Sequence, residues 1–183
     1  MDWGISREKV MTTTEAGASI EGAIKAGAPV FFLRPDQTLS PTARDNQIIP
    51  VVRVSIRPAF LNDRLKADSS KEAIDALALI DTGADLMYID EDFAVQHGFE
   101  TNQIATVSGA TSTQQQAAYP ALFKLCDDAK HYTQAALFTS SPLRKNGRKF
   151  DLILGMQLLS NGVLIMDFDS HTYRFEFTTK LDK

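Results

Sequence analysis

An apolar stretch that runs into Asp-Thr-Gly constrains this chain more than any other part of its sequence. Residues 73–80 are mostly apolar and predict a strand, and Asp81, Thr82 and Gly83 follow it directly as a turn. Gly83 lets another backbone segment come close because it has no Cβ, and the Thr82 hydroxyl is placed to hold the loop by a hydrogen bond. The segment therefore predicts a carboxylate, that of Asp81, at the end of a stiff apolar strand.

From residue 47 onwards the chain alternates short apolar runs with turn residues. Two short helices are expected, one capped by Asp90 and ending before Gly98, and one at 156–159. The basic stretch 144–149 surrounds Asn-Gly and predicts a solvated hairpin tip, and 59–70 predicts a loop. Strands are expected at 48–56, 86–89, 119–125, 132–138, 150–155, 163–168 and 172–177. Many short strands with little helix predict a mainly β fold, a closed barrel.

The first 46 residues lack the alternation of short apolar runs and turns seen in the rest of the chain. They are predicted to be an N-terminal extension to a domain at 47–183. Residues 14–26 carry a weak helical pattern, and 29–33 form a short apolar strand-like run. Three interpretations stay open: an arm packed on the domain, an arm that contacts a second copy, and a pro-segment that is removed. The packed arm is favoured because the apolar run would otherwise be exposed.

Composition excludes several classes of function. The net charge of −4 provides no clustered basic face, so nucleic acid is not an expected partner. Cys126 is the only cysteine and is expected to be a small buried hydrophobe, and His97, His131 and His171 lack metal-binding spacing. We therefore expect no metal and no organic cofactor. No apolar run approaches bilayer length and no signal peptide is visible, so we expect no membrane partner and a cytoplasmic location.

A carboxylate at the end of a strand has one chemical use that fits this setting. Two carboxylates that share one proton hydrolyse an amide: the ionised one activates water, and the protonated one supplies a proton to the leaving group. Asp-Thr-Gly occurs only once in the chain. The alternative is that Asp-Thr-Gly has only a structural role, as an Asx-type turn that ends a strand.

Two further features lie downstream of Asp81. Residues 106–113 are small and hydroxylated around one glycine, as in a hairpin tip, and Leu152-Ile153-Leu154-Gly155 is a second apolar strand followed by a short helix. In this order the three features resemble the retropepsin family of aspartic peptidases, including its bacterial and retrotransposon-type members. The resemblance covers about residues 47–177 and implies a retropepsin-like barrel.

The resemblance also implies roles for individual residues. Asp81 would be the catalytic aspartate, Thr82 would interlock two active-site loops, and Gly155 would let the second strand cross close to the loop. Viral members carry an arginine shortly after the second glycine, whereas this chain has Met156-Gln157, so Asp85 lacks that partner. The implied catalytic set is Asp81, Thr82 and Gly83, and the implied substrate-binding set is Ala84 and Asp85 with the flap residues Ser108, Gly109, Ala110 and Thr111.

One Asp-Thr-Gly per chain cannot supply a pair of carboxylates. The chemistry therefore predicts a homodimer with the site on its twofold axis, joined with the help of strand 172–177 and of residues 30–33. The leading hypothesis is an aspartic endopeptidase acting on an extended polypeptide. One alternative is a catalytically inactive retropepsin-like module for dimerisation or peptide binding. Another is an unrelated β-barrel in which Asp-Thr-Gly is only a turn.

Overall fold

A computed structural model describes residues 27–44, 48–61, 65–67, 70–108, 113–129 and 132–178. No described helix is long and apolar enough to span a membrane. The helical pattern predicted at 14–26 lies outside the described residues. The elements are β1 (Ala28–Pro29), β2 (Phe31–Leu33), β3 (Leu39–Ser40), β4 (Pro50–Leu61), β5 (Leu65–Ala67), β6 (Ile74–Ile80), β7 (Tyr88–Asp90), α2 (Glu91–Gln96), β8 (Gln103–Ser108), β9 (Thr113–Leu125), β10 (Gln134–Ser141), β11 (Leu152–Leu154), α3 (Met156–Leu159), β12 (Gly162–Asp167) and β13 (Thr172–Phe177).

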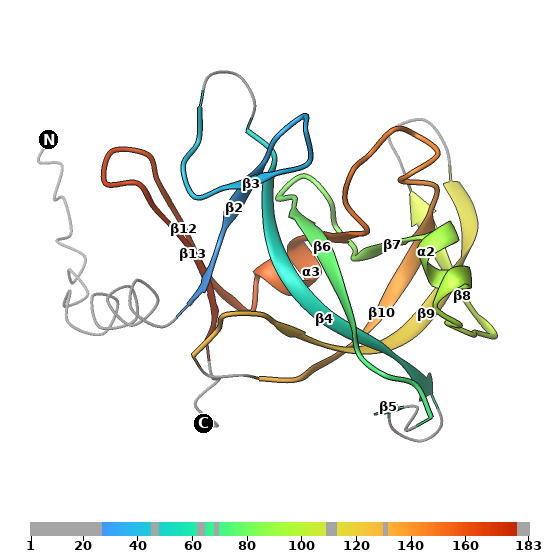
Figure 1. The fold of residues 1–183 in the computed structure, drawn as a ribbon. Coiled ribbons are helices and arrows are strands. Elements are labelled where there is room, and N and C mark those ends of the chain that lie inside the picture. Colours follow the sequence, from blue (N-terminus) through green and yellow to red (C-terminus); the bar gives the residue numbers. More distant parts are fainter. Residues whose placement is uncertain are drawn as a thin grey trace, which may run out of the picture.

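The central feature is a closed β-barrel (Figure 1). Its ring runs β4, β6, β11, β7, β10, β9 and back to β4. Most neighbours are antiparallel, but β6 pairs with β11 in parallel, and β7 pairs with β10 in parallel. The predicted mainly β barrel with two short helices is confirmed. The parallel pair β6–β11 matters most for function because both strands end at the same edge of the barrel, next to Asp81.

Side chains alternate across the barrel wall, as the period of a strand requires. On β6, Ala76, Ala78 and Ile80 are buried in the main core, which continues through Phe123 and Phe138 of β9 and β10. The other face of the same strands carries a second, smaller cluster. Its members are Leu33, Val51, Leu143 and Phe150, with Phe31, Leu39, Leu77, Leu79 and Ile153 packed against them.

Part of the predicted N-terminal extension pairs with one barrel strand and with the C-terminal hairpin. β2 pairs with the start of β4, and β1 pairs with β13. Ala28 and Phe32 are fully buried, and the Phe32 ring meets Tyr173 edge-on at 4.8 Å between centroids. Residues 28–33 therefore contribute to the core of the same fold. A boundary at residue 46, and removal of the segment before it, stay predictions.

The predicted C-terminal hairpin is present as β12 and β13, which pair along their whole length. β13 lies in the middle of a three-stranded sheet, between β1 and β12. Its edges are thus already paired with this chain's own strands. Among the described residues β1 and β12 each have a neighbour on one side only, so the free edges of this small sheet belong to the two-residue β1 and to β12, and none belongs to β13.

Two sequence-based expectations were wrong. The strand expected at 48–56 continues through Pro58 to Leu61, and part of the expected loop 59–70 is β5. Pro58 is tolerated because the ladder from β4 to β6 ends at Ile56, so its missing N–H removes no bond on that side. The basic stretch 144–149 is a turn, but it joins β10 to β11, which do not pair with one another and instead flank β7.

The short helix α2 begins where its capping residue predicts. The Asp90 carboxylate accepts a hydrogen bond from the Phe93 amide at 2.9 Å, and Gly98 has φ of 66° at the C-terminal end. Asp90 is fully buried and also accepts from the Arg144 amide at 2.8 Å. This carboxylate is therefore committed to joining α2 to the β10–β11 turn.

Candidate active site

Asp81 follows directly on β6, in a loop that two other segments hold in place. Its amide donates to the Leu154 carbonyl at 3.1 Å, which continues the parallel ladder of β6 and β11 by one bond. Its own carbonyl accepts from the Ala84 amide at 3.3 Å, closing a turn. The backbone of Asp81 is thus fixed both to the neighbouring strand and to its own loop.

The Asp81 carboxylate is half-buried, and one of its oxygens is oriented by the loop itself. Oδ1 accepts a hydrogen bond from the Gly83 amide at 2.8 Å. A Cβ added at Gly83 would lie 3.2 Å from the same oxygen, a tighter contact than ordinary packing. A glycine at this position therefore lets the loop fold back onto its own carboxylate while the carboxylate keeps access to solvent.

Gly155 brings the start of α3 against the Asp81 loop. A Cβ on Gly155 would lie 2.2 Å from the Leu86 carbonyl oxygen and 2.5 Å from that of Ala84, so no larger residue fits without movement of backbone. Immediately after it, Met156 donates to the Ala84 carbonyl at 2.7 Å and Gln157 donates to the Asp85 carbonyl at 2.9 Å. The close crossing expected of the second motif is therefore present in the structure.

The remaining loop residues face outwards. Thr82 and Asp85 are exposed, and Ala84 is half-buried. Among the described residues no hydrogen bond from the Thr82 hydroxyl to its own loop is recorded, and none joins the Asp85 carboxylate to a cation. Thr82 and Asp85 thus present polar groups to whatever meets this end of the barrel.

Tyr88 is a neighbour of the site that the sequence did not identify. Burial raises the pKa of the Tyr88 phenol, and the negative charges of Asp85 and Asp81 raise it further. Tyr88 alternates with the fully buried Ile89 on β7, so its ring lies on the opposite face from the main core. Its position three residues after Asp85, in a short strand, is the one sequence signal that points to it.

The predicted flap is described only up to its tip. β8 and β9 form an antiparallel hairpin in which Ser108 pairs with Thr113. In Figure 1 the ends of β8 and β9 that meet at this pair point to the same side of the barrel as the loop after β6. Gly109, Ala110 and Thr111 lie outside the described residues, as does the side chain of Ser108. Their contact with substrate stays a prediction.

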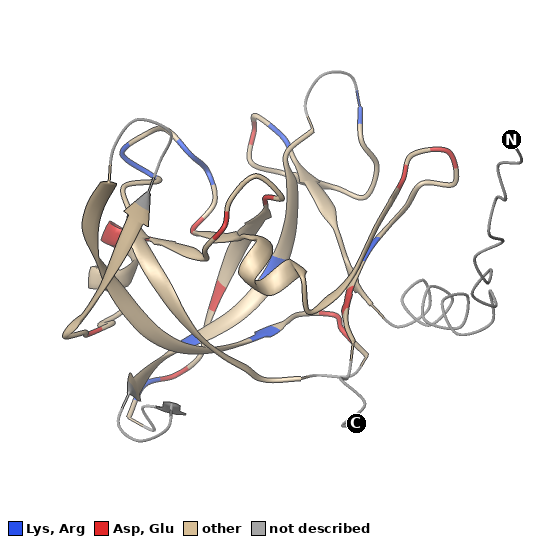
Figure 2. Ribbon diagram, turned by 180° about the vertical axis from the view of Figure 1, so that it is seen from behind, with Lys and Arg blue, Asp and Glu red and all other residues tan. Residues whose placement is uncertain are grey.

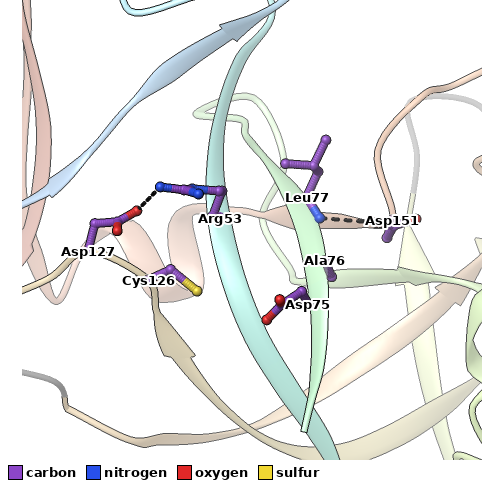
Figure 3. A pocket seen from close by; sticks show the side chains of 7 residues that line it. All are labelled: Arg53, Asp75, Ala76, Leu77, Cys126, Asp127 and Asp151. Carbon is purple, nitrogen blue, oxygen red and sulfur yellow. Dashed lines mark hydrogen bonds and ion pairs between the residues drawn. The ribbon is translucent and has the colours of Figure 1, made fainter. Parts of the chain in front are cut away.

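A separate cavity of about 240 Å³ opens elsewhere on the barrel, and Figure 3 shows its lining. Asp127 pairs with Arg53 at 2.5 Å, and Asp151 accepts from the Leu77 amide at 3.0 Å. Cys126 lies beside the Arg53–Asp127 pair (Figure 3). Burial, followed by the charges of Asp75 and Asp127, raises the pKa of the Cys126 thiol. Two of the carboxylates here are already paired, so this cavity offers no substitute for the Asp81 loop.

Comparison with known proteins finds remote likenesses among solved structures only. No family model and no curated protein matches the sequence. The solution structure of the Simian Foamy Virus (mac) protease is similar with a TM-score of 0.37 and 15% identity, covering 60% of this chain and 91% of that chain. The retroviral protease-like domain of Ddi1 from Leishmania major is similar with a TM-score of 0.33 and 15% identity, covering 71% and 98%. At these TM-scores and identities the two likenesses carry no argument about this chain.

Proposed function

We propose that this protein is an aspartic endopeptidase that acts as a homodimer, with one Asp81 from each copy in a shared site. The observation that supports this proposal most is the way the structure holds Asp81 in position. Its half-buried carboxylate follows a core strand, one oxygen is oriented by the Gly83 amide, and the loop is clamped through Gly155. Catalysis needs groups that are rigidly positioned before substrate arrives, and this loop is built for that.

The proposed reaction uses the pair of Asp81 carboxylates as base and acid. A peptide lies extended between the pair and the β8–β9 hairpin. The ionised Asp81 takes a proton from a water molecule, which attacks the peptide carbonyl carbon, while the protonated Asp81 of the partner subunit donates to the carbonyl oxygen. Proton transfer to the leaving nitrogen then breaks the C–N bond. The chemistry requires neither a metal nor a cofactor.

The free edge of β12 supports the proposed dimer. Val163 and Ile165 alternate on β12 with Leu164 and Met166, and the last two pack on the core. An unpaired strand edge is a ready site for pairing with a second chain. β12 also begins only a short helix after Gly155, so a second copy joined there would lie close to the Asp81 loop. We therefore assign the joining role expected of 172–177 to β12 instead.

Exposed polar groups on the loop fit the same proposal. In a dimer the Thr82 hydroxyls of the two copies meet beneath the paired carboxylates and hold both loops together. Ala84 and Asp85 contact the backbone of the bound peptide, and residues 108–111 close over it. These roles are the ones that the family resemblance implies for Thr82, Asp85 and the hairpin.

Cleavage of a mixed peptide library across about pH 3 to 7, the window of a carboxyl pair, tests the proposal. Wild-type protein should cleave with an optimum on the acidic side of neutrality, because one carboxyl of the pair must keep its proton. Asp81→Asn should lower the rate by about 10²–10⁴-fold while the protein stays folded and dimeric. Asp92→Asn serves as the matched control, since it changes an exposed carboxylate outside the loop and should leave cleavage unchanged.

Two results would count against the enzyme. Equal cleavage by wild type and Asp81→Asn would assign the activity to a contaminant. A folded dimer with no cleavage anywhere in this pH window would favour the inactive dimerisation or peptide-binding module. A strictly monomeric protein without cleavage would contradict both the peptidase and the inactive dimerisation module.

A further inference from the structure

An apolar groove of about 370 Å³ opens on the outer face of the barrel, between β2, the start of β4 and the turn from β10 to β11. Its floor contains the buried side chains of Leu33 and Phe150. Its wall contains Ile48 and Ile49, which are 52% and 39% exposed. Two consecutive exposed isoleucines above an apolar floor form a patch of the kind that marks a binding surface.

The groove lies next to the Asp81 loop. Val51 of β4 pairs with Leu79 of β6, and both side chains belong to the outer cluster. Val51–Leu79 is the last pair of this antiparallel ladder, and Ile49 and Asp81 each lie two residues beyond it, at the same end of the neighbouring strands. The Leu33 amide donates to the Ile49 carbonyl at 3.0 Å, which fixes the groove wall to β2. A peptide held at Asp81 can therefore extend across this groove.

Cations line the rim of the groove. Arg34, Arg148 and Lys149 are among its lining residues, and Figure 2 shows basic residues on both the β2–β3 turn and the β10–β11 turn. In the described part of the chain none of these three is in an ion pair; the Arg34 guanidinium donates to the Ser40 hydroxyl and the Thr42 carbonyl. Asp36 lies on the Arg34 turn, but its carboxylate is bound by Thr38.

Two other cations of the same turn behave differently. Arg144 pairs with Asp151 at 2.5 Å and lies 3.7 Å from Asp90, and Lys145 pairs with Glu91. Arg144 and Lys145 therefore attach the turn to the barrel through ion pairs, whereas Arg148 and Lys149 line the groove. On a chain with net charge −4, this is a local excess of positive charge beside an apolar surface.

We propose that this groove selects the polypeptide substrate, and that it binds segments in which an apolar side chain stands next to Asp or Glu. The apolar side chain occupies the space between Ile48, Ile49 and Phe150, and the carboxylate faces Arg148 and Lys149. The proposal rests on the peptidase function and deepens it, because it names the class of polypeptide that this site accepts. It makes Ile48, Ile49, Arg148 and Lys149 specificity-determining residues.

Binding to the full-length Asp81→Asn protein tests the proposal without cleavage. The probes are three fluorescein-labelled decapeptides that share a central Leu-Phe and differ only in flanking Glu, Gln or Lys. The Glu peptide should bind about tenfold more tightly than the Gln peptide at low ionic strength, since several exposed charge pairs each contribute a fraction of a kcal/mol. The Lys peptide should bind most weakly, and added salt should reduce the difference.

Two variants assign the effect to the groove. Arg148→Gln with Lys149→Gln should remove the preference for Glu over Gln, and Ile48→Ser with Ile49→Ser should weaken both peptides alike. Arg57→Gln with Lys124→Gln is the matched control, because it removes the same charge at another part of the barrel. Equal binding of the Glu and Gln peptides, or an equal loss in the control, overturns the proposal.

The two proposals fail in different ways. If wild type cleaves peptides without preferring the Glu peptide, the peptidase proposal stands and the proposal that the groove selects the substrate is wrong. If binding shows a preference that depends on the groove but wild type cleaves no peptide, the groove binds such segments and the peptidase proposal is wrong.

Discussion

Gly155 and Ala84 approach so closely that a Cβ on Gly155 would lie 2.5 Å from the Ala84 carbonyl oxygen. That oxygen is also the acceptor of the Met156 amide, at 2.7 Å. The contact joins the loop after β6 to the start of α3, two segments far apart in sequence. It explains why the Asp81 carboxylate has a defined position although it is only partly buried.

Gly155→Ala should therefore damage the fold at the site. The added methyl meets backbone atoms, which cannot move as a side-chain end can, and we expect a loss of about 3 kcal/mol or more in the free energy of unfolding. Gly147→Ala is the control: Gly147 has φ of 75° but nothing within 4 Å, so only backbone strain of about 1 kcal/mol is expected. Urea denaturation of the two variants measures the difference; similar losses would show that crowding at Gly155 is not the cause.

Mixing experiments test whether the site is shared between subunits. When wild type and Asp81→Asn are unfolded together in equal amounts and refolded, random pairing leaves about a quarter of the dimers with two intact Asp81 residues. Activity per wild-type chain should then fall to about half of its unmixed value. A site contained within one chain would keep the activity per wild-type chain unchanged, which peptide cleavage distinguishes directly.

The pKa of Tyr88 gives a prediction at alkaline pH. Because its folded-state pKa is raised, the unfolded chain loses the phenolic proton first as pH rises. The unfolded state is then favoured, so above about pH 10 the free energy of unfolding of wild type falls with pH, and Tyr88→Phe lacks this contribution. Urea midpoints of the two proteins should diverge from about pH 9 to 11, with wild type losing more. Tyr132→Phe, which changes another tyrosine, controls for the loss of one phenol.

The Cys126 thiol should be alkylated slowly in the folded protein. Its raised pKa leaves less thiolate at a given pH, and the thiolate is the nucleophile. Alkylation by iodoacetamide at about pH 8 should therefore be slower in the folded protein than in urea. The Arg53 charge lowers this pKa, so Arg53→Gln should slow the reaction further. Faster alkylation in that variant would mean that access, rather than charge, controls the thiol.

Asp90 should matter for stability although it lies outside the site. Asp90→Ala removes the cap of α2 and the acceptor of the Arg144 amide in a buried position, and we expect a loss of about 2 kcal/mol or more. Asp92→Ala, an exposed change in the first turn of the same helix, should cost less than about 0.5 kcal/mol. Thermal denaturation gives both values, and equal losses would contradict a special role for Asp90.

The sequence predicted the parts of the fold that depend on local chemistry. An apolar strand into Asp81, the cap at Asp90 and the glycine at 155 each follow from a residue and its immediate neighbours, and each lies in the described structure where it was expected. The barrel class followed from the number and spacing of short strands. These features need no knowledge of which strand pairs with which.

Features that depend on distant partners were not predicted. Pro58 predicts the end of a strand, but β4 continues past it: the ladder with β6 ends at Ile56, and Pro58 lies opposite Ala121 of β9. The basic stretch after β10 predicts a solvated tip, whereas Arg144 pairs with Asp151 and lies close to Asp90. Beyond its place three residues after Asp85, Tyr88 carries no sequence signal of its own for the site, because its relation to Asp81 and Asp85 is spatial. Such roles are fixed by long-range register, which residue patterns alone do not carry.

The bonds from β11 and α3 to the Asp81 loop have a consequence during synthesis on the ribosome. A nascent chain that has emerged only as far as the β8–β9 hairpin already contains Asp81, but not Leu154 or Gln157, which hold its loop. The carboxylate is therefore left without its scaffold until most of the chain has been translated. The order of residues along the polypeptide thus delays assembly of the site until the domain is nearly complete.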